Sequence, residues 1–314
     1  MRIPNASRLP HVWTDDELAE HQKRALNAFV DRRLAEPSTR YIELLRVRRA
    51  AIHRLVRLLA PIDPANSDIV VVRQILGNAE LESALRYMAG PPISADDLGV
   101  VVTRGTQRLT KRRINTDPTL ATDILRLICQ LADSERFPWV RDNRPPKRYE
   151  LKQAIRATTS LHAAQTMQTE RRNYGKEVER YLENRLVQAE FTKVPSPNAG
   201  KINAPIHLPK AGTFYGECSL YGRRADLLIG LPDGRCVAVE AKDSSSVVNS
   251  VKRVLNDTAA KADFWHGKLG ESVIPVALLS GVFGVENLKS AQARRLFLVW
   301  SDNLDSFADW ITAQ

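Results

Sequence analysis

Hydrophobic positions in the first half of the chain recur three and four residues apart, which is the spacing of one face of an α-helix. Thr14 and Glu17 form a capping box that opens a helix running to Glu36, just before Pro37. In the segment 39–60 the apolar stripe consists of Leu44, Val47, Ala51, Leu55 and Leu58. Further helices are expected over 67–76, 78–89, 95–100 and 118–132. The first half of the chain is therefore predicted to be helical.

The second half changes from helical to strand-like spacing. A long helix is expected over 152–189, and strands are expected at 213–220, 225–231 and 235–242. Asp233-Gly234 predicts a hairpin turn between the last two strands. The elements expected beyond the hairpin are helix 247–268, strand 273–279, helix 286–294, strand 296–300 and helix 303–312. This order predicts an α/β (mixed α+β) fold, in which a mixed central sheet is flanked by helices.

We therefore expect two regions, a helical one over residues 1–150 and a sheet-containing one over 151–314. The composition, 43% hydrophobic and 26% charged, is that of an ordinary globular protein. Charges interrupt every hydrophobic run and the first residues lack a long apolar segment, so neither a membrane span nor a secretory signal is expected. Three cysteines without metal-type spacing disfavour a disulfide framework or a zinc cluster and favour a reducing cytoplasm.

The formal net charge of +10 is spread over both halves of the chain and raises the expectation of a polyanionic partner, nucleic acid first. One side of the predicted helix 39–60 carries the basic stripe Arg46, Arg49, His53 and Arg57. This stripe is compatible with phosphate binding, although a solvated helix face is the interpretation we favour from the sequence. Lys111-Arg112-Arg113 is similarly interpreted as a solvated turn rather than a phosphate clamp.

The candidate chemistry lies on the hairpin. Glu240 and Lys242 are two residues apart on a predicted strand and therefore point to the same face. The antiparallel return of the hairpin brings Asp226 alongside them. Two carboxylates with waters and a phosphate oxygen suit Mg²⁺, and the lysine beside them can position a water and stabilise charge on a phosphate. A surface hairpin with an ordinary salt bridge is the alternative interpretation.

The spacing Asp226…Glu240-Ala241-Lys242 resembles the PD-(D/E)xK nuclease superfamily, with Ala225 where that motif has its proline. In this superfamily the two acids bind metal, and the carbonyl of Ala241 is a further candidate ligand. Such nucleases often carry a glutamate four residues after a glycine on the preceding helix, which Gly175 and Glu179 match. Glu177 and Glu183 are the competing acids on that helix and are expected to be solvated charges paired with Arg180 or Arg185 on the same helix.

The chain also resembles the XamI-type restriction endonucleases over most of its length. The segments that carry this resemblance are Trp13-Thr14, Glu36-Pro37, Arg136–Arg141, Arg171–Asn173, Gly175-Lys176, Gly222–Asp226, Glu240–Lys242, Asn249–Arg253, Asn256-Asp257, Lys261-Ala262, Pro275–Phe283 and Trp300. The resemblance implies a restriction-endonuclease-like core, a Type II enzyme that uses Mg²⁺ and cleaves double-stranded DNA, a prokaryotic cytoplasm and a separate cognate DNA methyltransferase. The family's named member is associated with GTCGAC.

Hydrogen-bonding and cationic residues close to the hairpin are candidates for DNA contact. They are Ser244, Ser245, Asn249, Lys252, Arg253, Asn256 and Arg223. The alternative for this segment is that Ser246 caps a helix and the other side chains face water. A repair or junction-resolving nuclease and a non-catalytic DNA-binding protein are the rival functions. One acid–acid–lysine set per chain predicts a homodimer, which matches the two-fold symmetry of a palindromic DNA site.

Overall fold

The computed structural model describes residues 8–59, 69–105 and 109–314. Contacts divide the chain into two compact units. The helical unit is Ala35–Thr169, and the sheet unit joins the residues up to Leu34 with Glu170–Gln314. This division differs from the expected boundary near residue 150. The N-terminal helix α1 (Asp15–Ala35) is almost entirely part of the sheet unit, because its buried Leu18 packs into the core beside the sheet.

The helical unit encloses a core of its own. Its elements are η1 (Glu36–Ser38), α2 (Arg40–Leu58), α3 (Ile69–Gly77), α4 (Ala79–Arg86), α5 (Ala95–Thr103), α6 (Lys111–Thr116), α7 (Pro118–Leu131), α8 (Pro138–Arg141) and most of α9 (Arg148–Arg172). Leu55, Ile75 and Ile124 are among the fully buried side chains that hold these helices together. Lys111-Arg112-Arg113, which was expected to form a solvated turn, instead forms the start of α6. The Thr110 hydroxyl caps this helix by accepting a hydrogen bond from the Arg113 backbone amide.

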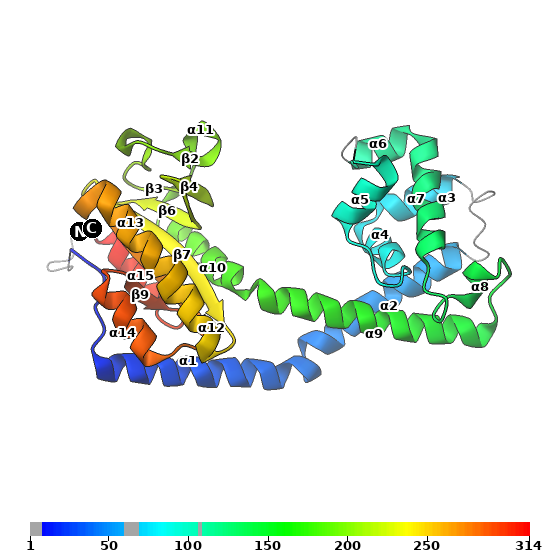
Figure 1. The fold of residues 1–314 in the computed structure, drawn as a ribbon, viewed down its shortest axis with the longest axis horizontal. Helices are drawn as coiled ribbons and strands as arrows, with labels where there is room; N and C mark the ends of the chain where they lie inside the picture. Colours follow the sequence, from blue (N-terminus) through cyan, green and yellow to red (C-terminus); the bar gives the residue numbers. More distant parts are fainter. Residues whose placement is uncertain (1–7, 60–68, 106–108) are drawn as a thin grey trace. The chain divides into compact units, whose positions relative to one another are not determined.

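The sheet unit is built on a six-stranded mixed sheet with the order β1-β3-β6-β7-β8-β9 (Figure 1). Its strands are β1 (Thr192–Lys193), β3 (Thr213–Tyr215), β6 (Leu227–Gly230), β7 (Cys236–Ser244), β8 (Val273–Gly281) and β9 (Phe297–Trp300). The strands β6 and β7 form the antiparallel hairpin, whereas β7, β8 and β9 run parallel. A second sheet contains β2 (Lys201–Ile202), β4 (Cys218–Leu220) and β5 (Arg223–Ala225), with the short α11 (Pro197–Gly200) and η2 (Pro205–His207) close by in sequence. The predicted mixed α/β fold is confirmed.

Helices cover both faces of the six-stranded sheet. Side chains of alternate sheet residues, such as Val237 and Val239, pack with α10 (Tyr174–Gln188) and α15 (Leu304–Thr312). The opposite face packs against α1 and the helical segments between and after β7 and β8 (Figure 1). Those segments are α12 (Val247–Ser250), the π-helical η3 (Val251–Ala259), α13 (Ala260–Leu269), the turn η4 (Gly270–Ser272) and α14 (Val285–Ala293). Glu240 and Lys242 therefore point toward η3 and α13.

Three predicted elements are divided in the structure. The strand expected over 213–220 is interrupted at Gly216-Glu217, so that β3 joins the large sheet and β4 joins the small one. The helix expected over 152–189 breaks at Asn173, whose backbone is not helical. The helix expected over 247–268 contains the π-helical turns of η3, a form that often occurs at functional sites. No helix of the described residues is long and apolar enough to span a membrane.

Candidate active site

The hairpin register places the two predicted acids opposite each other. Leu227 pairs with Val239, and the amide of Asp226 donates to the Val239 carbonyl at 2.9 Å. Asp226, one residue before Leu227, therefore lies across from Glu240, one residue after Val239. Asp226 is the junction between β5 of the small sheet and β6 of the large sheet. The sequence prediction that the hairpin brings these carboxylates together agrees with this register.

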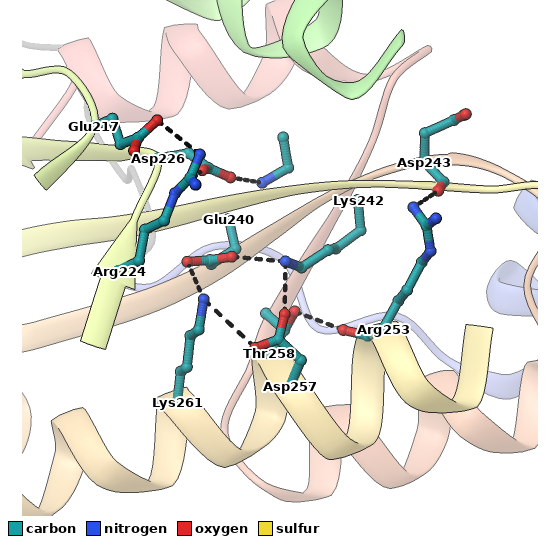
Figure 2. A network of polar contacts seen from close by, with 11 residues as sticks. Glu217, Arg224, Asp226, Glu240, Lys242, Asp243, Arg253, Asp257, Thr258 and Lys261 are labelled. Atoms are coloured by element: carbon teal, nitrogen blue, oxygen red, sulfur yellow. Dashed lines mark hydrogen bonds and ion pairs between the residues drawn. The ribbon is translucent and has the colours of Figure 1, made fainter. Parts of the chain in front are cut away.

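The Asp226 carboxylate is fixed from two sides. Its Oδ2 accepts a hydrogen bond of 2.8 Å from the Ala241 amide, and its Oδ1 lies 3.6 Å from Nε of Arg224 (Figure 2). Arg224 also donates to Glu217 at 2.7 Å, so its guanidinium is shared between two acids. The Asp226 side chain is only 13% exposed. It is therefore held in one orientation at the edge of the hairpin while remaining accessible.

Glu240 is a buried carboxylate held by two lysines. Its side chain is 2% exposed, its Oε2 lies 2.8 Å from Nζ of Lys242, and its Oε1 lies 2.7 Å from Nζ of Lys261 (Figure 2). Burial raises the pKa of Glu240 above its ordinary value; Lys242 opposes that rise and Asp226 adds to it. A carboxylate this deeply buried needs such partners, because an unpaired charge there is strongly unfavourable.

Asp257 completes a network in which acids and lysines alternate. Its Oδ2 lies 2.8 Å from Nζ of Lys242, and its Oδ1 lies 3.5 Å from Nζ of Lys261. Burial alone would lower the pKa of Lys242, but Glu240 and Asp257 outweigh it and raise that pKa, so Lys242 is an ammonium at neutral pH. Asp257 in turn has a lowered pKa, because hydrogen bonds and charge from the two lysines exceed the effect of its partial burial. The network holds the ammonium of Lys242 in a defined place.

Glu179 lies on α10, the helix that covers the opposite side of the hairpin. Burial, together with the negative charges of Asp226 and Glu183, raises the pKa of Glu179 to about 7. Its charge therefore interacts with that of Asp226. Gly175, one turn earlier, packs against β7, since a Cβ there would lie 3.8 Å from the Ala241 carbonyl oxygen. Among the competing acids on this helix, Glu177 is exposed.

The other competing acid, Glu183, forms an ion pair of 2.6 Å with Lys193 on β1. The expected partners on its own helix are therefore replaced by a residue brought in by the sheet. Arg185 instead forms an ion pair of 2.8 Å with Asp305 on α15. Glu179 is thus the glutamate of α10 whose pKa is raised by the charge of the hairpin acid Asp226.

The seven candidate DNA-contact residues have different environments. Ser245, Asn249, Lys252 and Asn256 are exposed. Arg223 is exposed and its guanidinium lies 5.3 Å from the ring centroid of Phe264. Arg253 is exposed but donates to the carbonyl of Asp243.

Ser244 differs from the other candidates. Its side chain is fully buried, and its hydroxyl donates to the Ser246 carbonyl at 2.8 Å. This hydroxyl is used inside the protein, so we do not retain Ser244 in the proposed DNA surface. Ser246 caps α12 by accepting from the Asn249 amide at 3.2 Å, as the alternative interpretation of this segment predicted.

The oxygen donors at the hairpin have the chemistry of a hard divalent cation site. Among the described residues, no group of three His, Cys, Asp or Glu side chains is already gathered around one point as a cation would require. However, Asp226 lies across from Glu240, and the pKa values of both Glu179 and Glu240 are raised by the charge of Asp226. Carboxylates that repel one another in this way are favourable ligands, because a bound cation removes the repulsion.

Comparison with known proteins identifies the family. The sequence model of the XamI restriction endonuclease family matches residues 66–300. The Type II restriction enzyme XamI of Xanthomonas campestris pv. amaranthicola is 34% identical over 273 residues, covering 85% of this chain and 95% of that protein. The chain belongs to the XamI restriction endonuclease family. The sequence-based prediction of a Type II restriction endonuclease is thereby confirmed. No solved structure matches the chain.

The XamI family match includes all the candidate residues of the active site. It covers part of the helical unit and the sheet unit through β9, so the match is not confined to the hairpin. Sequence reasoning had not assigned a role to Asp257 or Lys261, although both stand in segments that carry the family resemblance. Their four-residue spacing is a signal of a helical ion pair. Only the packing of η3 and α13 on the sheet shows that this pair contacts Glu240 and Lys242.

Proposed function

We propose that this member of the XamI restriction endonuclease family is a Mg²⁺-dependent enzyme that hydrolyses phosphodiester bonds in double-stranded DNA at a specific sequence. The observation that carries the proposal is the register of β6 and β7, which sets Asp226 across from Glu240 with Lys242 on the same face as Glu240. This is the arrangement of the PD-(D/E)xK nucleases, and it is built here from one hairpin.

Asp226, Glu240 and the Ala241 carbonyl are the proposed ligands of the cation, with Glu179 supporting a second ion or the water network. Hard oxygen donors of this kind suit Mg²⁺. When bound, the cation supplies Lewis-acid stabilisation of the charge that develops on the phosphoryl oxygens. The Ala241 amide holds Asp226 by a 2.8 Å hydrogen bond, so this ligand is oriented by the backbone of the strand that carries the other acid.

Lys242 is proposed to act as an ammonium. Its raised pKa, which Glu240 and Asp257 maintain, makes it a poor general base at neutral pH but a fixed positive charge and hydrogen-bond donor. In that form it orients the attacking water and stabilises the negative charge of the pentacovalent transition state. Asp257 and Lys261 are proposed as positioning residues, because they hold Lys242 and Glu240 without belonging to the hairpin.

The biological setting follows from the family. We propose that the enzyme belongs to a restriction–modification system, works in the prokaryotic cytoplasm and is accompanied by a separate DNA methyltransferase that protects the host sites. GTCGAC is the proposed recognition sequence. The exposed residues Ser245, Asn249, Lys252 and Asn256 lie beside the hairpin in sequence, and Asn, Lys and Ser side chains are suited to contact base edges and phosphates. Arg253 and Arg223 are proposed to contribute to the same surface.

A homodimer is the proposed active form. Cleavage of both strands needs two sites of opposite polarity, and the chain has one set of Asp226, Glu240 and Lys242. A two-fold dimer on a palindromic site satisfies both requirements. Sedimentation of the protein with a short cognate duplex should give two chains per duplex. A one-to-one complex that makes concerted double-strand breaks would contradict the proposal.

The decisive test is cleavage of unmethylated plasmid by the purified protein with Mg²⁺, followed by sequencing of the ends. Discrete ends within GTCGAC are expected, together with no cleavage in EDTA and none at sites that the cognate methyltransferase has modified. Cleavage confined to branched DNA would instead indicate a junction-resolving enzyme. Sequence-specific binding without any cleavage would indicate a DNA-binding protein.

A further inference from the structure

A groove on the helical unit is lined by basic side chains from two helices that are distant in sequence. It has a volume of about 1420 Å³ and lies between α2 and the first half of α9. The α2 residues that line it are Arg46, Arg49, His53 and Arg57, the basic stripe that we interpreted from the sequence as a solvated helix face. These residues are three and four positions apart and therefore form one row along the helix.

A second row comes from α9 and faces the same groove. It consists of Arg148, Lys152 and Arg156, each four residues after the last, and all three are exposed. Among the apolar residues that line the groove, Val56 is buried and Ile155 is half-buried, and the exposed part of the lining is basic apart from Ile42 and Ala50. Among the described residues, the groove lining includes no acid.

The basic side chains of these rows are not used to stabilise the fold. Within the described part of the chain, none of the seven forms a side-chain hydrogen bond or an ion pair, whereas neighbouring arginines do. Arg40, for example, pairs with Glu43 at 2.6 Å, and Arg144 holds the buried Glu150 by two hydrogen bonds. Clustered arginines and lysines without counter-charges repel one another, and an anion bound in the groove would relieve that repulsion.

We propose that this groove binds the sugar-phosphate backbone of duplex DNA, as a second DNA surface separate from the cleavage site. The α2 row extends over about 16 Å at 1.5 Å per residue, a length over which duplex DNA presents on the order of nine phosphate charges. Arginine supplies most of the cations in both rows, and its planar guanidinium matches phosphate oxygens in a bidentate manner. The inference rests on the proposed function in taking DNA as the ligand.

Salt-dependent binding of the full-length protein to a labelled non-cognate duplex of about 30 base pairs, in EDTA, tests this site. The groove variant carries Arg49→Gln, Arg57→Gln and Lys152→Gln. The control variant carries Arg54→Gln, Lys111→Gln and Arg112→Gln, which removes the same charge from exposed positions of the helical unit outside the groove. The groove variant should bind at least about tenfold more weakly at 0.1 M salt, and the slope of log K against log salt should fall by about 3. The control variant should keep its slope within about one unit of wild type.

Three results would overturn the proposal. The first is an unchanged affinity and slope in the groove variant, and the second is an equal change in the groove and control variants. The third is loss of binding to polyglutamate in the groove variant while DNA binding persists, which would assign the groove to an acidic protein partner. Because binding is measured without metal, the outcome does not depend on the cleavage chemistry. Normal DNA binding without plasmid cleavage by the wild type would contradict the proposed function alone.

Discussion

Lys261 and Glu240 form an ion pair of 2.7 Å between α13 and β7, and the Glu240 carboxylate is 2% exposed. This lysine holds the oxygen of Glu240 that Lys242 does not contact. The pair therefore connects a helix to the acid that we propose as a metal ligand. Its loss should affect both the stability of the sheet unit and the geometry of the site.

Replacement of Lys261 should allow its effect on stability to be measured separately from its effect on cleavage. Lys261→Met keeps the length of the side chain but leaves one buried oxygen of Glu240 without its partner, which costs about 1–3 kcal/mol of stability. We expect the cleavage rate of the folded variant to fall by roughly tenfold to a hundredfold with DNA affinity unchanged, because Lys261 positions Glu240 and does not contact DNA. Thermal unfolding and single-turnover cleavage measure the two quantities.

Lys268→Met is the matched control, since Lys268 is an exposed lysine on the same helix. It should leave both quantities near wild type. Partial recovery of the cleavage rate in Lys261→Arg, which restores the charge, would support the proposal that Lys261 positions Glu240. A Lys261→Met enzyme with normal kcat and KM would show that Glu240 keeps its place without this partner.

The two acids of the hairpin should be needed for cleavage, and the protein should still fold without either charge, although Glu240→Gln also lowers stability because it removes the ion pair with Lys261. Asp226→Asn and Glu240→Gln keep the size of each side chain but remove its charge, so plasmid cleavage in Mg²⁺ should fall by at least about a thousandfold. DNA binding measured in EDTA should persist or become tighter, because the carboxylates repel phosphate. Glu177→Gln, a change at an exposed acid of α10, is the control. Near-normal cleavage by either hairpin variant would remove that residue from the proposed site.

Lys242 should affect the rate and not the demand for metal. We expect Lys242→Ala to lower the single-turnover rate by about a hundredfold to a thousandfold, the range for loss of one group that stabilises transition-state charge. The Mg²⁺ concentration for half-maximal rate should change little, since an ammonium is no metal ligand. The measurement is a Mg²⁺ titration of the cleavage rate. Recovery of the wild-type rate at high Mg²⁺ would instead make the lysine a structural partner of Glu240.

His162 makes stability depend on pH. Burial, with the charges of Arg48 and Arg86, lowers the pKa of His162 to about 3, and the side chain is 2% exposed. The folded protein therefore keeps His162 neutral where the unfolded chain, with its pKa near 6.5, binds a proton. Stability is unaffected above pH 6.5 and falls below it, by about 2 kcal/mol between pH 7 and pH 5.

Urea unfolding at several pH values measures this dependence. The slope of stability against pH gives the number of protons that the unfolded state binds in excess of the folded state. His162→Gln should lower this number by about one, whereas His53→Gln, at an exposed histidine of α2, should not change it. An unchanged pH dependence in His162→Gln would show that the acid sensitivity arises elsewhere.

The sequence by itself determined the part of the site that depends on local geometry. A strand alternates its side chains with a period of two and a short turn fixes the register, so the approach of Asp226 to Glu240 and Lys242 was predictable from spacing, whereas their proposed roles came from the family resemblance. The mixed sheet and most helices followed from hydrophobic periodicity in the same way. Ser244 shows the limit of spacing, because its exposure depended on the contacts of the strand end and it proved to be fully buried.

Tertiary structure decided every relationship between elements distant in sequence. Lys261 reaches Glu240 because α13 packs on the sheet, and Arg148, Lys152 and Arg156 face the stripe of α2 because about ninety residues of the helical unit fold between them. The breaks at Asn173 and Gly216-Glu217 were likewise not evident from periodicity. The position at which a helix packs on the sheet depends on many small apolar contacts across the whole core. The total energy of these contacts cannot be inferred from any short segment of the sequence.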